Sequence, residues 1–157
     1  MKIVDTASDP WSLGRLAPDS APAHRWLGLE QWLATRRTWP ADAAAGVALP
    51  NDADVEALAD ALQPLALVAL TFPKWTDGRA YSQARLLRTR LRLRSEIRAV
   101  GDVLVDMLPL LQRTGFDSVE LRAGQDIGAA RRALGFFDRH YQDALLCHPE
   151  HDTERTA

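Results

Sequence analysis

The amino-acid sequence predicts an α/β domain with a mainly parallel sheet, because short apolar runs alternate with segments of helical periodicity along its 157 residues. The clearest run, residues 65–70, is continuously apolar and stands between Pro64 and Pro73, as expected of a central strand covered on both faces. Such alternation requires crossover connections and therefore parallel strands. About five short strands are expected, in a flavodoxin-like open sheet or a partial β/α barrel, because both architectures use the same repeating unit.

The first half of the chain supplies three of the predicted strands. An apolar run at 26–29 precedes a predicted helix over 30–39, in which apolar residues recur at helical spacing. A second apolar run at 46–49 leads to a predicted helix over 55–62, which Asp54 is placed to cap because its carboxylate can accept backbone N–H groups. The central strand described above follows this helix.

The next two predicted helices flank a fourth strand. The helix predicted over 81–93 carries its arginines outward and is followed by a strand at 97–100. Asp102 is then placed to cap a predicted helix over 103–113. Pro109 falls inside this helix, where a proline removes a backbone donor and should bend or shorten the helix.

The last predicted elements follow Gly115, whose position suits a left-handed helix cap. A fifth strand is expected at 118–121, and a final helix begins near Asp126 and resumes after Gly135. The chain length allows one domain with a core and is too short for two ordinary ones. The predicted organisation is an extended N-terminal arm over 1–23, a single α/β domain over 24–147 and a flexible tail over 148–157.

Charge and hydropathy make several function classes unfavourable. The formal net charge of -2 gives no global attraction to nucleic acid or to an anionic membrane. No apolar stretch approaches the ~20 residues that span a bilayer, and the N-terminus turns polar at once instead of entering an apolar signal region. We therefore expect a cytoplasmic protein without a membrane segment.

Known cofactor and metal motifs are missing from the sequence, so no cofactor and no metal site is expected. There is no Gly-x-Gly-x-x-Gly and no Gly-Lys-Ser/Thr phosphate loop. The four histidines avoid the predicted strand ends. The single cysteine, Cys147, excludes an internal disulfide, a redox pair and a cluster held by four thiolates. The sequence thus leaves open whether the protein is an enzyme.

Candidate binding residues gather where the predicted strands end, because ligands of parallel α/β folds lie beyond the carboxyl ends of the strands. The loop after the central strand combines cations with a carboxylate, and the helix after it adds hydroxyl groups. This mixture suits an anion or a protein partner. The candidates are Lys74, Asp77, Arg79, Tyr81, Ser82, Arg85 and Asp102.

Each of these features also has a purely structural interpretation. Asp77 with Gly78 is good turn chemistry, and Asp102 is in the first place a helix cap. A row formed by Arg85, Arg88 and Arg92 on one helical face is usually no more than a solvated surface.

Three segments of the chain are similar, in order and spacing, to the signature blocks of an uncharacterised bacterial family, domain-of-unknown-function family 934. They are residues 72–88, 96–104 and 115–121, and the resemblance extends from Leu29 to Tyr141. Members of that family are described as oxidoreductases of sulfite reduction and are often encoded beside the sulfite reductase haemoprotein. No catalytic residues are established for the family, so none are transferred to this chain.

The sequence also departs from the pattern of that family. Ala80 stands where a glycine is expected, and the run Met107-Leu108-Pro109 replaces a more polar and aromatic one. A strained backbone at position 80 is therefore not expected here.

Two functional hypotheses remain open on the sequence. As the resemblance implies, the protein is an accessory protein of assimilatory sulfite reduction that docks on sulfite reductase through its basic helix and the adjoining loop. Alternatively, it is a small enzyme or oxidoreductase that binds an oxyanion or a phosphorylated metabolite at the candidate residues. Exposed edges of a half-barrel would favour a homodimer. Nucleic-acid binding by the arginines is the least favoured, because the net charge is negative and aromatic residues are not interleaved with them.

Overall fold

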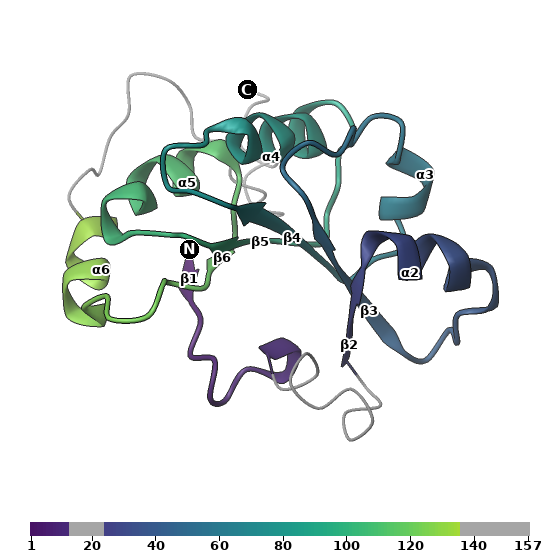
Figure 1. Ribbon diagram of the computed structural model, residues 1–157, viewed down its shortest axis with the longest axis horizontal. Coiled ribbons are helices and arrows are strands. Elements are labelled where there is room, and N and C mark those ends of the chain that lie inside the picture. The colour runs from purple at the N-terminus through teal and green to yellow at the C-terminus, as the bar shows by residue number, and fades with distance from the viewer. Residues whose placement is uncertain (13–23, 136–157) are drawn as a thin grey trace, which may run out of the picture.

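Six parallel strands form one sheet in the computed structural model, which describes residues 1–12 and 24–135 (Figure 1). Their order in the sheet is β1-β6-β5-β4-β3-β2, and every neighbouring pair is parallel. The α/β class and the open parallel sheet are as predicted, but there are six strands instead of five. The strands are β1 (Lys2–Ile3), β2 (His24–Gly28), β3 (Ala44–Leu49), β4 (Leu67–Phe72), β5 (Glu96–Gly101) and β6 (Ser118–Val119).

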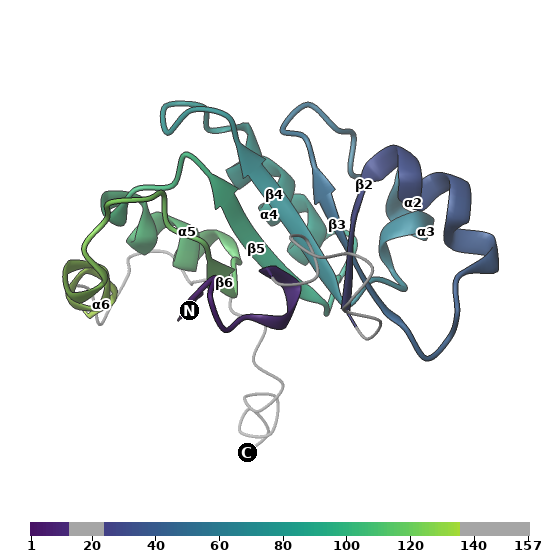
Figure 2. The same ribbon diagram turned by 60° about the horizontal axis from the view of Figure 1, so that its bottom comes forward.

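The connections between β2 and β6 all progress in one direction, because each strand lies beside the next strand of the chain. Right-handed crossovers that never reverse place their helices on one face of the sheet. Figures 1 and 2 show this arrangement, with the helices on one face and the N-terminal segment against the other. A flavodoxin-like sheet reverses its strand order and carries helices on both faces. The arrangement here matches part of a β/α barrel.

The helices differ in length, and two of them are short 3₁₀ turns. They pack their apolar sides on the sheet, where Val68, Leu70 and Phe72 of β4 are buried among them. Trp32 is buried in the same core and donates its indole N–H to the backbone oxygen of Ala61 at 2.8 Å. The elements are α2 (Leu29–Thr35), η1 (Arg36–Thr38), α3 (Ala59–Leu62), α4 (Arg79–Thr89), η2 (Val105–Met107), α5 (Leu108–Thr114) and α6 (Ile127–Leu134).

Two predicted boundaries in the first half of the chain move in the structure. The strand predicted at 65–70 begins two residues later, at Leu67, because the chain is still turning out of α3 at Leu65. Only the last turn of the helix predicted over 55–62 is α-helical. Asp54 nevertheless accepts the two backbone N–H groups of Glu56 and Ala57, at 3.0 and 3.1 Å, as a capping residue does.

Pro109 starts a helix instead of bending one. It lies in the first turn of α5, where a missing N–H costs nothing because that donor has no partner within the helix. The preceding residues form η2, whose cap is Leu104, so Asp102 does not cap a helix as predicted. Gly115 ends α5 with φ of 101°, which confirms the predicted left-handed cap.

The sixth strand comes from a stretch where the sequence pattern predicted none. Lys2 pairs with Ser118 and Ile3 pairs with Val119, which makes β1 one end of the sheet. No helix among the described residues has the length and apolar character to cross a membrane. The predicted tail, Cys147 and the expected continuation of the last helix after Gly135 lie outside the residues that the structure describes.

Candidate functional site

The carboxyl ends of β3 to β6 bring four loops to one edge of the sheet, which we call the C-terminal edge. The loop between β4 and α4, residues 73–78, lies in the middle of this edge and carries two of the predicted candidates, Lys74 and Asp77, and Arg79 follows as the first residue of α4. Neighbouring strands contribute Asn51 after β3, Asp102 after β5 and Arg122 after β6. The site that sequence patterns indicated is therefore formed from adjacent strands.

Asp77 is the polar centre of the β4–α4 loop. Its carboxylate accepts two bonds from the guanidinium group of Arg79, at 3.0 and 2.7 Å, and one from the amide of Asn51 at 2.7 Å. It also accepts the backbone N–H of Arg79 at 3.2 Å, as the predicted turn requires. The bonds from Arg79, helped by Asn51, lower the pKa of Asp77 from 3.8 to about 2. The same pairing raises the pKa of Arg79, so the two groups stay charged together.

Asp102 connects two loops of the C-terminal edge. Its carboxylate accepts the backbone N–H of Trp75 at 3.0 Å and a guanidinium N–H of Arg122 at 2.9 Å. Gly101 makes this position possible, because its φ of 97° turns the chain and an added Cβ would lie 2.5 Å from the backbone oxygen of Phe72. Asp102 therefore fixes the β4–α4 loop.

Three candidates on α4 do not join this edge. The Tyr81 ring packs against Phe72 and Phe116, with centroids 5.2 and 6.3 Å away, and burial raises the pKa of its hydroxyl. Ser82 and Arg85 are exposed on the outside of the same helix.

The prediction that Arg85, Arg88 and Arg92 form an exposed row on one face of α4 is wrong for Arg88 and Arg92. Arg88 is buried and donates to the backbone oxygens of Leu93 at 2.6 Å and Gly115 at 2.9 Å, and it forms an ion pair with Asp117. Arg92 lies beyond the helix with φ of 52°. Arg88 is thus a structural residue, which leaves Arg85 alone on the exposed face.

Two side chains of the β4–α4 loop remain available to a partner. Trp75 is 55% exposed, although its backbone is held by Asp102. Lys74 is exposed and forms no ion pair within residues 1–12 and 24–135. An exposed indole beside an unpaired ammonium group offers apolar area and positive charge at one point.

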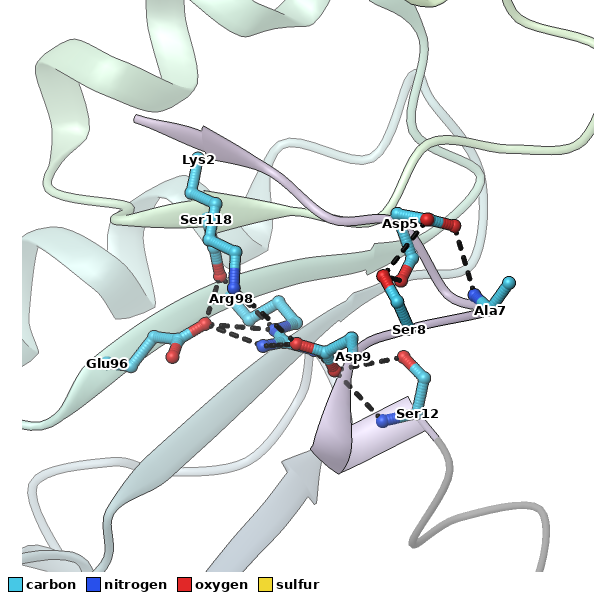
Figure 3. Close-up of polar contacts among 9 residues, drawn as sticks. All are labelled: Lys2, Asp5, Ala7, Ser8, Asp9, Ser12, Glu96, Arg98 and Ser118. Carbon is cyan, nitrogen blue, oxygen red and sulfur yellow. Dashed lines mark hydrogen bonds and ion pairs between the residues drawn. The ribbon is translucent and has the colours of Figure 1, made fainter.

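A second polar cluster, which we call the inner-face network, lies on the face of the sheet away from the helices (Figure 3). Arg98 of β5 is its centre and is 0% exposed. Its guanidinium group donates to both carboxylate oxygens of Asp9, at 2.7 and 3.1 Å, and to Glu96 at 2.8 and 3.1 Å. Ser118 donates to Glu96 and accepts from Arg98 at 3.2 Å, while Lys2 lies 3.7 Å from Asp9.

The inner-face network holds the N-terminal segment on the sheet. Asp9 also accepts the backbone N–H and the hydroxyl of Ser12, at 2.9 and 3.1 Å. Burial alone raises the pKa of Asp9, but hydrogen bonds from Arg98 and Ser12 outweigh it and lower the pKa from 3.8 to about 2. Beside this contact, Trp11 packs on Gly46, where an added Cβ would lie 2.8 Å from the indole ring.

The sequence analysis did not predict this network, although the spacing of Glu96 and Arg98 was visible in the sequence. Glu96 and Arg98 are two residues apart on a strand and therefore share a face. Asp9 lies 89 residues from Arg98 in the chain, and no local pattern connects them. Within the part of the chain that the structure describes, no three His, Cys, Asp or Glu side chains gather closely enough to hold a metal ion.

Comparison with known proteins identifies the family of this chain. A search of curated proteins finds no match. A family model described as "Bacterial protein of unknown function (DUF934)" matches residues 46–150. This range begins within β3 and includes the β4–α4 loop, Asp102 and Arg98, whereas Asp9 lies before it. Because the match covers more than half of the chain, the protein belongs to the DUF934 family of bacterial proteins.

Proposed function

We propose that this protein is an accessory protein of assimilatory sulfite reduction that binds sulfite reductase through the β4–α4 loop. The observation that carries the docking site is Trp75, which exposes 55% of its surface from a loop whose backbone is fixed. The link to sulfite reduction comes from the resemblance of residues 72–88 and 96–104 to their family blocks.

The β4–α4 loop is suited to docking because neighbouring loops hold it in one conformation. Asn51 bonds to Asp77 from one side, at 2.7 Å. Asp102 bonds to the Trp75 backbone from the other side, and Arg122 holds Asp102 in turn. A loop that is ordered before binding loses little conformational entropy when a partner arrives. Exposed tryptophans on such loops are typical anchors of protein interfaces.

Ion pairing at the C-terminal edge favours a protein partner over a small oxyanion. Arg79 and Arg122 could each bind an oxyanion, but Asp77 and Asp102 already accept their guanidinium hydrogens. A small anion would have to displace a carboxylate that belongs to the protein. Docking through Trp75 and Lys74 breaks no existing contact.

The first experiment measures binding of tagged protein to sulfite reductase from the same organism, at low salt. We expect the wild-type chain to retain the enzyme and Trp75→Ala to weaken binding by about 30-fold or more, as loss of a central tryptophan anchor does. Leu33→Ala is the matched control, because Leu33 is an exposed apolar residue on α2 outside the loop. If the wild-type chain does not bind, or if both variants bind alike, the loop is not the docking site.

Growth tests ask whether the protein acts in sulfite reduction in the cell. A strain without the gene should fail on sulfate and on sulfite and grow on sulfide, and the Trp75→Ala gene should not restore growth. Normal growth on all three sulfur sources would separate the protein from sulfite reduction. Calorimetry with sulfite and with phosphate tests the alternative, in which a small anion binds and Lys74→Ala abolishes the heat of binding.

A further inference from the structure

A groove at the β1 end of the sheet belongs neither to the C-terminal edge nor to the inner-face network. It has a volume of about 300 Å³ and lies between β1 and α6. Figures 1 and 2 show α6 and β1 at the same end of the sheet, opposite β2. Its apolar wall consists of Met1, Ile3, Val4, Ile127 and Leu134, and its polar residues are Asp5 and Arg131.

Among the residues that the structure describes, no strand pairs with the outer side of β1. Lys2 donates its N–H to the backbone oxygen of Asp117, just before β6, at 2.7 Å, and Val4 donates to that of Val119 in β6 at 2.8 Å. Because alternate residues of a strand direct their backbone groups to opposite sides, the N–H and C=O of Ile3 point away from the sheet. Open edges of this kind pair readily with another chain.

We propose that this edge binds a second copy of the same chain about a two-fold axis, with β1 antiparallel to the β1 of its partner. In such a pair Ile3 of one protomer faces Ile3 of the other, and the two residues exchange N–H to C=O bonds. Ile127, which is 50% exposed at the start of α6, then packs in the apolar centre of the contact.

The groove carries one acidic and one basic side chain, Asp5 and Arg131. Such a surface can pair with a second copy of itself, as a two-fold interface requires. Within residues 1–12 and 24–135, the Asp5 carboxylate accepts only local bonds, from the N–H of Ala7 at 3.1 Å and the hydroxyl of Ser8 at 3.0 Å. Arg131 forms no ion pair with any residue that the structure describes. Asp5 and Arg131 line the same groove, so in the proposed dimer Asp5 of one protomer pairs with Arg131 of the other, twice in each dimer.

The test is sedimentation equilibrium of the full chain and of charge variants. The wild-type chain should be a dimer, and Ile127→Glu should be a monomer at the same concentration. Asp5→Lys alone and Arg131→Glu alone should each weaken the dimer by about tenfold or more, because each places like charges in contact twice. Mixing these two variants should restore a heterodimer, in which both contacts again join opposite charges.

A matched control and two opposite outcomes make the result decisive. Leu33→Glu adds the same charge to an exposed apolar site on α2, at the other end of the sheet, and should leave the dimer intact. A wild-type chain that is monomeric at about 100 µM would overturn the proposal, since a useful dimer binds more tightly than this. Cross-linking that placed the chain's own residues 136–157 in the groove would also overturn it, and so would mixed variants that stay monomeric.

Discussion

The inner-face network and the C-terminal edge each contain an arginine–aspartate ion pair, but one pair is buried and the other is partly exposed. In the network, the side chains of Arg98 and Asp9 are 0% and 3% exposed. At the edge, the side chains of Arg122 and Asp102 are 50% and 24% exposed, although the shortest contact is similar, at 2.9 Å against 2.7 Å. The comparison shows that distance alone does not define the role of an ion pair. Burial decides whether the pair holds the fold together or fixes an exposed loop.

The two ion pairs differ in how much it costs to remove the cation and leave the carboxylate behind. A buried carboxylate without its cation has no water to replace the bond, and its desolvation remains uncompensated. An exposed carboxylate exchanges its cation for water at little cost. We therefore expect single substitutions to destabilise the protein more in the network than at the edge.

The largest expected effect is that of Arg98→Ala. It leaves Asp9 buried and Glu96 half-buried without their cation and should lower the free energy of unfolding by roughly 3–5 kcal/mol. Urea unfolding followed by circular dichroism measures this value. Arg122→Ala, which breaks an exposed pair with Asp102, should cost about 1 kcal/mol or less. Equal costs for the two variants would contradict the contrast between the regions.

A smaller effect is expected from Gly46→Ala on the inner face. The new methyl group would lie 2.8 Å from the Trp11 ring and 3.2 Å from Cβ of Leu67, so Trp11 must move. We expect a cost of about 1–3 kcal/mol. Gly28→Ala is the control, because no atom lies within 4 Å of its added Cβ and its cost should stay within about 0.5 kcal/mol. Thermal unfolding and tryptophan fluorescence, to which Trp11 contributes as one of five tryptophans, would show whether the N-terminal segment is displaced. An unchanged spectrum would argue against this packing.

The smallest expected effect is a difference in how the pKa values of Asp9 and Asp77 respond to added salt. Both carboxyl groups have a pKa lowered from 3.8 to about 2, so both stabilise the folded state above about pH 4 and lose this contribution as pH falls through 2. Added 1 M salt screens exposed charges strongly. The pKa of Asp77 should therefore rise toward its ordinary value, while that of Asp9 stays low. Carboxyl carbon NMR titrations at two salt concentrations measure both, and a parallel rise would show that Asp9 is also in contact with solvent.

Local patterns were enough to predict most of the sheet. Five of the six strands follow from apolar runs, because a strand covered by helices needs several consecutive apolar residues. The two residues of β1 are too few to show any period, and their partner strand lies at the other end of the described chain. The boundaries of α3 and α5 were displaced where a turn or Pro109 replaced regular helix.

In the candidate site too, contacts between residues close in sequence could be predicted, whereas contacts between distant residues could not. The Asp77 turn was predictable because its partner Arg79 is two residues away. Asp102 was expected to cap a helix, since a preference for capping is visible in sequence whereas a bond to Arg122, 20 residues later, is not. Arg88 was expected to face solvent, but the chain returns 27 residues later and offers the backbone oxygen of Gly115.

The pairing of β1 with β6 also fixes an order of events during synthesis. Lys2 is made more than a hundred residues before Ser118, its partner in the sheet. At ~5–20 residues per second, the ribosome needs many seconds to supply that partner. During this time Asp9 faces water, because Arg98 also emerges late. The segment that supplies the last strand at this end of the sheet is thus exposed to chaperones and proteases until translation has passed β6. Folding dominated by such distant pairings is slow.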